Sequence, residues 1–167
     1  MTPDTYYIID SSSLIELNRK YPIDIFPSLW KNMEGLIKNG FLLSHEEVFK
    51  EIIEGDDELA GWAKRHRRLF KGYDEKQMET VREILLKYPS LAKADNEKAS
   101  ADPFLIAMAV GFLNDKQQTL DGSRKGKLIV TEEKLRGNRV RIPFVCKDYG
   151  IDCIEVLEMC RREGWKF

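Results

Sequence analysis

The sequence contains little cysteine or histidine, with three cysteines and two histidines among 167 residues. Cys146, Cys153 and Cys160 form no CxxC pair, and both histidines lie far from them along the chain. Zinc sites in proteins are built from closely spaced cysteine and histidine ligands, so these residues do not predict one. An odd number of scattered cysteines is instead typical of buried free thiols in a reducing cytosol.

Long apolar runs and an excess of one charge are also missing. No apolar stretch approaches the ~20 residues that span a bilayer, and the first residues lack the basic and apolar segments of a signal peptide. We therefore expect a cytoplasmic protein that does not enter a membrane. The chain has 27 basic and 28 acidic side chains, so its net charge of −1 gives no overall nucleic-acid signal. Local basic patches can still bind nucleic acid.

The order of the apolar segments predicts the fold class. Four short segments rich in aliphatic, β-branched and aromatic residues are typical of buried strands, and amphipathic helical segments separate them. The expected strands are residues 6–10, 41–44, 127–131 and 151–156. This alternation predicts an α/β protein, a three-layer α/β/α sandwich with a short, mainly parallel sheet of four or five strands.

One domain is expected over residues 1–167, because this length suits a single hydrophobic core. Two amphipathic helices predict a helical arm on that domain at about residues 56–90, and the first of them is expected over 56–70. The apolar and aromatic residues of the arm are candidates for a homodimer contact. They include Trp62, Phe70 and Tyr73.

Acidic residues stand near the ends of the expected strands. Asp10 directly follows the first strand, Glu133 follows the third, Glu51 lies on the helix after the second, and Asp102 opens an apolar helix. Ligands of parallel α/β folds bind outside the carboxyl ends of the strands, so we expect these acids to meet at one edge. Each acid alone has a simpler explanation, as a strand end, a helix cap or a solvated loop residue.

The four acids together predict a metal site. Clusters of oxygen ligands suit hard cations such as Mg²⁺ and Mn²⁺. Neighbouring carboxylates repel one another unless cations compensate their charge. Such cations can activate water and stabilise the charge on a phosphodiester during its cleavage.

Four motifs, in this order along the chain, resemble those of PIN-domain nucleases: IIDSSSLIEL, LLSHEEVFKEIIEG, SADPFLIAMAV and LIVTEEK. Further segments resemble one uncharacterised, mostly prokaryotic subgroup of these proteins, the DUF4411-like proteins of toxin type. They are YPIDIFPSLW, GDDELAGWAK, SADPFLIA, NRVRIPFVC and GWKF. The resemblance covers nearly the whole chain.

The resemblance implies both a function and the residues that perform it. It implies a PIN-like fold and an Mg²⁺- or Mn²⁺-dependent endoribonuclease that hydrolyses RNA phosphodiester bonds, commonly as a toxin silenced by a cognate antitoxin protein. It assigns catalysis and metal binding to the acids that match the motifs, which are Asp10, Glu51, Asp102 and Glu133. Ser12 and Thr131 become supporting hydroxyls.

The chain departs from the family pattern at two positions. Ser12 stands where asparagine is common, and Glu133 stands where aspartate is usual. The longer side chain of Glu133 moves its carboxylate by about one methylene group, which leaves open whether Glu133 binds the metal directly.

Two basic runs flank Glu133 and are candidates for contacts with RNA phosphates. Residues 123–127 include Arg124 and Lys125, and residues 136–141 include Arg139 and Arg141. A third basic run, at residues 64–68, is typical of a solvated helix face.

Two other functions stay open. One is a catalytically silent PIN-like module that binds RNA or a partner protein, although such modules tend to lose acids and all four are present here. The other is a phosphatase that forms an aspartyl phosphate, which also begins with an aspartate after the first strand. That chemistry generally needs a second acid two residues later, where this chain has Ser12.

Glu47 and Glu51 stand four residues apart, so both project from the same helix face. We expect Ser44 to be the N-cap and the segment 44–47 to form a capping box, in which Glu47 binds the Ser44 amide. This gives Glu47 a structural role and leaves Glu51, which matches the family motif, for the metal.

Overall fold

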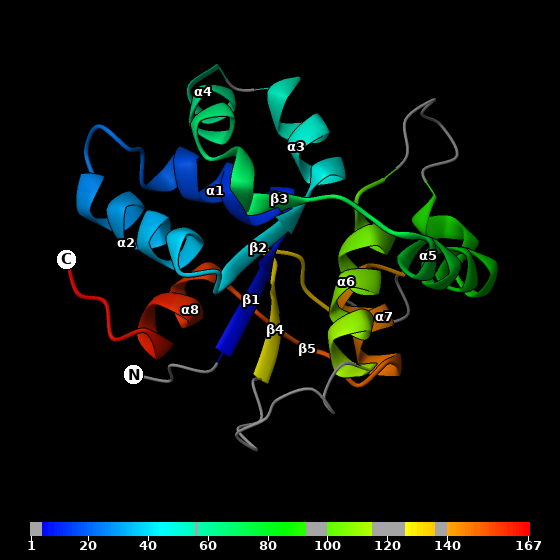
Figure 1. Ribbon diagram of the computed structural model, residues 1–167. Coiled ribbons are helices and arrows are strands. Elements are labelled where there is room, and N and C mark those ends of the chain that lie inside the picture. Colours follow the sequence, from blue (N-terminus) through cyan, green and yellow to red (C-terminus); the bar gives the residue numbers. More distant parts are fainter. Residues whose placement is uncertain (1–4, 56, 93–99, 115–125, 136–139) are drawn as a thin grey trace.

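The computed structural model describes residues 5–55, 57–92, 100–114, 126–135 and 140–167 (Figure 1). Its centre is a parallel five-stranded sheet with the strand order β3-β2-β1-β4-β5. The strands are β1 (Thr5–Ile9), β2 (Leu42–His45), β3 (Phe70–Lys71), β4 (Gly126–Val130) and β5 (Asp152–Ile154). The expected parallel sheet is therefore confirmed.

Helices cover both faces of the sheet (Figure 1). One layer contains α1 (Ser11–Lys20), α2 (Pro27–Lys38) and α8 (Val156–Arg162). The opposite layer contains α5 (Glu75–Lys87), α6 (Asp102–Asn114) and α7 (Ile142–Asp148). Two more helices, α3 (Glu46–Ile53) and α4 (Asp57–Arg65), pack against each other and against α1. The fold is an α/β/α sandwich, as the sequence predicted.

Burial on both faces explains why the central strands are almost continuously apolar. Tyr7, Ile8 and Ile9 of β1 are fully buried, and Ile129 of β4 beside them is buried equally. A parallel strand covered by helices on each side needs apolar residues at successive positions. Helix α6 lies against β1, β2 and β4, and its residues from Leu105 to Ala109 are buried around its whole circumference. These elements form the core that supports the edge where the strands end.

The strand β3 was not expected. The segment 56–70 was predicted to be one helix, but α4 ends at Arg65 and a 3-10 turn (Arg67–Leu69) leads into β3. Phe70 pairs with Ser44 of β2 and packs its ring against Phe49 at a centroid distance of 5.2 Å. The prediction of a helix through Phe70 is wrong because the edge of the sheet, and not a helix stripe, buries this residue. The segment 56–90 therefore contains two helices and also one edge strand.

Two of the three aromatic residues expected at a homodimer contact are used inside the chain. Trp62 is buried, with its ring 5.0 Å from that of Trp30, and Phe70 is also buried. Tyr73 is exposed on one side and stacks on His45 with the other. The expectation that Trp62 and Phe70 serve a homodimer is wrong, because both belong to the hydrophobic core.

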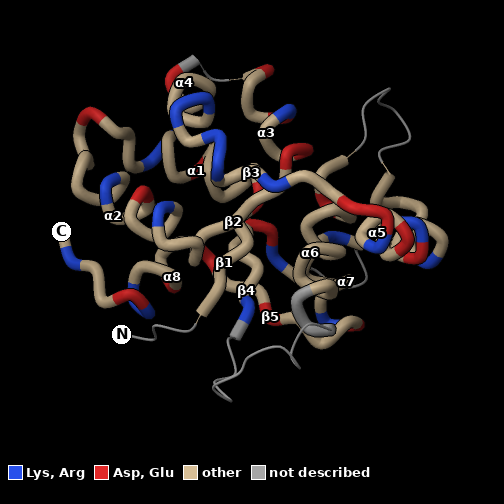
Figure 2. Tube along the Cα trace, in the orientation of Figure 1, with Lys and Arg blue, Asp and Glu red and all other residues tan. Residues whose placement is uncertain are grey.

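The three cysteines are free thiols, as expected, and Cys146 and Cys160 are buried, whereas Cys153 is only half-buried. Among the described residues, no helix is both long and apolar enough to cross a membrane. Lysine and arginine are interspersed with aspartate and glutamate along most helices, whereas the strands carry few charges (Figure 2). An interaction with a highly charged ligand must therefore rest on local groups of side chains.

Candidate functional site

The strand order reverses between β1 and β4. From β1 the chain moves outward through β2 to β3, and it then returns to the other side of β1 to form β4 and β5. In open parallel sheets, the loops after two such strands diverge and leave a crevice that commonly binds a ligand. The residues that follow directly are Asp10 after β1 and Thr131 after β4.

Asp10 is the most tightly held of the predicted acids. Its side chain is 2% exposed, and it caps α1 by accepting a hydrogen bond from the Ser13 amide at 2.8 Å. The Ser12 hydroxyl lies 2.8 and 2.9 Å from the two carboxylate oxygens, and the Thr131 hydroxyl donates at 2.5 Å. Both predicted supporting hydroxyls therefore contact the Asp10 carboxylate.

Burial raises the pKa of Asp10 above its ordinary value of 3.8, although hydrogen bonds from Thr131, Ser13 and Ser12 act in the opposite direction. Removal from water is thus the largest influence on this carboxylate, and it disfavours the charged form. A cation bound beside Asp10 would favour the charged form. The surroundings of Asp10 therefore fit a metal ligand.

Glu51 connects the beginnings of two helices. It lies near the end of α3, and its two oxygens accept hydrogen bonds from the Ser11 hydroxyl at 2.6 Å and from the Ala101 amide at 3.0 Å. Ala101 directly precedes Asp102, the first residue of α6. Glu51 therefore holds the segment that carries Asp102 against the start of α1, which carries Ser11 and Ser12.

Glu133 lies in the loop after β4. Its amide donates to the Thr131 hydroxyl at 3.1 Å, and its carboxylate accepts a hydrogen bond of 3.2 Å from the Ile142 amide at the start of α7. The preceding amide, that of Glu132, donates to the Ser12 hydroxyl at 3.2 Å. This loop is therefore attached to both α1 and α7, beside Asp10.

The four predicted acids line one cavity of about 510 Å³. They come from four separate segments, and the wall between them includes Ser11, Ser12, Ser100 and Arg141. Among the described residues, no three His, Cys, Asp or Glu side chains are grouped closely enough to hold a metal ion together. The acids thus surround a common space, while Glu51 and Glu133 use oxygens to accept hydrogen bonds from main-chain amides.

Of the four basic residues predicted to bind RNA, only Arg141 is described. It is exposed, precedes α7 as its N-cap and lines the acidic cavity. Arg124, Lys125 and Arg139 lie outside the described residues. In the basic run at residues 64–68, His66 contacts Glu34 at 3.2 Å and Arg67 covers the Phe49 ring at 3.8 Å. This run therefore helps to attach α4 to its neighbours.

The expected capping box at residues 44–47 is wrong. Ser44 remains in β2, where its hydroxyl donates to the Ile9 carbonyl of β1 at 2.6 Å. His45 is the N-cap of α3, and its Nδ1 atom accepts from the Glu47 amide at 3.1 Å. Glu47 instead binds Lys50 at 2.8 Å, and it is not among the residues that line the acidic cavity.

Ser11, whose hydroxyl donates a hydrogen bond to Glu51, was not among the residues expected at the site. The run of three serines after Asp10 was a visible signal, because small hydroxyl side chains beside a buried acid commonly donate hydrogen bonds to carboxylates. Which of the three serines faces Glu51 depends on how α1 packs against α3, and the sequence alone does not determine this packing.

The chain was compared with known families of proteins. The model of a family described as "Domain of unknown function (DUF4411)" matches residues 7–167. No curated protein and no solved structure matches the chain.

Proposed function

The chain belongs to the DUF4411 family, whose description assigns no function, and we propose that it is an Mg²⁺- or Mn²⁺-dependent endoribonuclease with a PIN-like fold. One observation carries the proposal. Four acids from separate segments line a single cavity at the point where the strand order reverses. The chemistry of this cavity, rather than the family description, supports the proposal.

The donor set suits a hard divalent cation. The acids that would hold it are Asp10, Glu51, Asp102 and Glu133, which offer only oxygen ligands, as Mg²⁺ and Mn²⁺ prefer. When bound, the cation supplies a water molecule of lowered pKa and stabilises negative charge on a phosphodiester. Ser12 and Thr131 would hold the Asp10 carboxylate in position through the hydrogen bonds already described.

Arg141 gives the cavity a positive group at its edge. Its guanidinium would bind a phosphate oxygen of the RNA backbone, because its planar array of donors matches phosphate geometry. The Arg141 backbone also precedes Ile142, whose amide binds Glu133. The residue proposed to bind the phosphate and an acid proposed to hold the metal are therefore fixed at the same helix start.

Cleavage of single-stranded RNA by the purified chain tests this proposal. We expect cleavage with Mg²⁺ or Mn²⁺ and none after chelation, while Arg141→Ala should raise KM more than it lowers kcat. Absence of cleavage with either metal, on RNAs of varied sequence, would contradict the nuclease and favour the alternative, a catalytically silent module that binds RNA or protein. That alternative is supported by the lack of a closely grouped trio of ligands among the described residues.

We further propose that the chain is the toxin of a toxin–antitoxin pair, as the resemblance to toxin-type PIN proteins implies. Induced expression in bacteria should then arrest growth, and Asp10→Asn should relieve the arrest at equal protein levels. Co-expression of a small protein encoded beside the chain should do the same. Normal growth with active wild-type enzyme in the cells would contradict the toxin role but leave the nuclease intact.

A further inference from the structure

A second cavity, of about 520 Å³, adjoins the acidic one. The two cavities share Ser12, Glu133 and Arg141 in their walls. Beyond this shared wall, the second cavity extends between α1 and the start of α8. A linear ligand with one group in the acidic cavity could therefore continue directly into the second.

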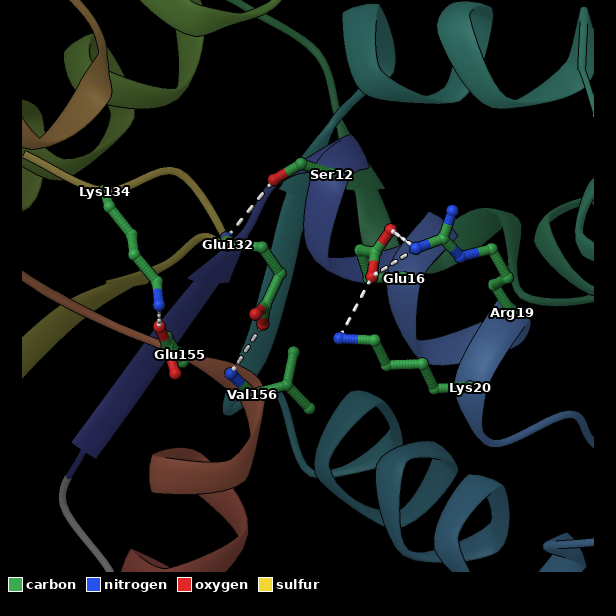
Figure 3. A network of polar contacts seen from close by, with 8 residues as sticks. All are labelled: Ser12, Glu16, Arg19, Lys20, Glu132, Lys134, Glu155 and Val156. Carbon is green, nitrogen blue, oxygen red and sulfur yellow. Dashed lines mark hydrogen bonds and ion pairs between the residues drawn. The ribbon is translucent and has the colours of Figure 1, made fainter. Parts of the chain in front are cut away.

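The acids of the second cavity already have partners (Figure 3). Glu16 accepts from Arg19 at 2.9 Å and from Lys20 at 3.2 Å, and Glu155 accepts from Lys134 at 3.4 Å. Glu132 accepts from the Val156 amide at 3.0 Å. These contacts place two lysine ammonium groups, those of Lys20 and Lys134, at the cavity wall.

The lysines are able to change partners. The side chains of Lys20 and Lys134 are 59% and 64% exposed, and both belong to ion pairs at the surface. Exposed ion pairs contribute little to stability, so separating these two lysines from their carboxylates costs the fold little.

The remainder of the wall is apolar. Leu17, Tyr21, Val156 and Leu157 line the cavity next to the charged groups. Leu17 and Val156 are buried, so the Tyr21 ring and the exposed Leu157 side chain form the surface on which a base can stack. Such a surface suits a single strand, because the bases inside a duplex are already stacked on their neighbours. The volume lies within the ~300–1,000 Å³ usual for small-ligand pockets. Apolar wall and lysines together fit one nucleotide.

We propose that this second cavity binds the nucleotide adjacent to the cleaved phosphate of a single-stranded RNA. Lys20 and Lys134 contact the backbone phosphates, and the apolar wall beside Tyr21 holds the base. Arg141, at the shared wall, contacts the phosphate between the two cavities. This inference rests on the proposed nuclease function, which it deepens by naming a substrate subsite.

Binding of labelled single-stranded RNA in chelator, followed by fluorescence anisotropy at several salt concentrations, tests the subsite without cleavage. The double variant Lys20→Ala/Lys134→Ala should bind about 10-fold more weakly at low salt, because two phosphate contacts are lost. The slope of log Kd against log salt should fall by roughly 1.4, since each contact with a single strand contributes about 0.7. Unchanged Kd and slope would overturn the subsite.

Two control variants make the result specific. Lys31→Ala/Lys64→Ala removes the same charge from exposed positions of α2 and α4, and it should retain wild-type affinity. Lys20→Arg/Lys134→Arg keeps both charges and should also retain it. Equal weakening in the Lys31→Ala/Lys64→Ala variant would mean that total charge, not this cavity, determines binding, and would overturn the subsite.

Kinetics separates this proposal from the nuclease. If the wild-type chain cleaves, the Lys20→Ala/Lys134→Ala variant should raise KM with little change in kcat. Cleavage by this variant with the wild-type KM would contradict the proposed subsite but not the proposed nuclease function. Absence of cleavage by the wild-type chain, together with lysine-dependent binding, would remove the nuclease and leave an RNA-binding cavity.

Discussion

At Asp10, burial and charge oppose each other. Its pKa is raised, so the folded protein favours the neutral form more than the unfolded chain does. The stability from this group is complete below its ordinary pKa of 3.8 and is lost as the pH rises through the folded value. At neutral pH, where the unfolded chain releases this proton more readily than the folded protein, the buried carboxyl therefore lowers the stability of the metal-free protein.

We predict that Asp10→Asn raises the melting temperature of the metal-free protein at neutral pH and abolishes cleavage. Asparagine keeps the shape and can accept the Ser13 amide, but it removes the buried charge. Calorimetry in chelator should show the gain, and the gain should shrink as the pH falls toward 3.8. Mn²⁺ should raise the melting temperature of the wild type more than that of the variant.

The matched control for this variant is Asp24→Asn, the same chemical change at an exposed position outside both cavities. It should leave stability, the response to Mn²⁺ and cleavage unchanged. An Asp10→Asn protein that cleaves RNA at the wild-type rate would sink the proposed mechanism.

The glutamates of α3 provide a second comparison. Glu51 lines the acidic cavity, whereas Glu47 binds Lys50 outside it. Glu51→Gln should abolish metal-dependent cleavage and lose little stability, because the amide can still accept one hydrogen bond and donate another. Glu47→Gln should leave both nearly intact, within ~0.5 kcal/mol in stability. If Glu47→Gln were inactive and Glu51→Gln active, Glu47 and not Glu51 would be the metal ligand, and the assignment made here would be wrong.

The buried imidazole of His45 makes stability depend on pH. Its Nδ1 atom accepts from the Glu47 backbone amide, and its Nε2 atom lies 3.1 Å from the side-chain oxygen Oε1 of Gln77, so a neutral ring with the proton on Nε2 fits both contacts. Burial lowers the pKa of His45 below 6.5, chiefly by disfavouring the charged form. The stability from this group is present above 6.5 and is lost as the pH falls through the folded value.

We predict that His45→Asn weakens this pH dependence. Asparagine can still cap α3, but it has no charge to gain between pH ~7.5 and ~5. The variant should be less stable than the wild type at the upper pH, because the ring contacts with Tyr73 and Phe104 are lost. The difference in unfolding free energy should narrow at the lower pH. A constant difference across this range would contradict the assignment to His45.

At the scale of elements, α6 lies within the hydrophobic core, and α5 packs on the outside of α6. Leu105 of α6 is fully buried, whereas Leu86 of α5 is 82% exposed. Leu105→Ala should lower the free energy of unfolding by ~2–5 kcal/mol, since it removes buried contacts and leaves a cavity. Leu86→Ala, the same substitution on the neighbouring helix, should change it by less than ~0.5 kcal/mol. Urea denaturation of both variants measures the contrast, and equal losses would contradict this arrangement.

The elements that could be predicted are those whose burial produces a recognisable apolar pattern in the sequence. β1 and β4 lie between two helix layers, so their sequences are apolar runs, and α6 is apolar for the same reason. β3 could not be predicted, because two residues are too few to show the alternation of apolar and polar side chains that marks a strand. Only its pairing with β2 makes it a strand. The predicted N-cap of α3 was also wrong because of a contact between strands, since the Ser44 hydroxyl donates to a carbonyl of β1 and does not cap the helix.

The candidate site could be predicted in part. The positions of Asp10 and Thr131 follow from the strands that precede them, since parallel strands end at the same edge. The Ser11–Glu51 contact and the second cavity depend on how α1 lies against α3 and α8. Such distances come from helix packing in three dimensions, which no short motif encodes.

At the scale of the whole molecule, one hydrogen bond joins distant parts of the sequence. The Tyr7 hydroxyl of β1 donates to the Glu163 carboxylate, just after α8, at 2.7 Å. Tyr7→Phe should lower the free energy of unfolding by about 1.5–3 kcal/mol, as expected for a hydrogen bond to a charged group. Glu163→Gln, which keeps an acceptor, should cost less. Metal affinity should not change in either variant, and a change would show that this contact also positions the acidic cavity.

The separation of the site residues along the chain has a consequence for protein synthesis. The Asp10 carboxylate and the Thr131 hydroxyl that binds it are 121 residues apart. At about 5–20 residues per second, a ribosome needs roughly 6–24 s to translate that interval. Throughout this time the nascent polypeptide lacks β4 and Glu133, which complete one wall of the acidic cavity. If the proposed function holds, the nascent chain therefore cannot cleave the messenger or ribosomal RNA beside it until synthesis has passed β4.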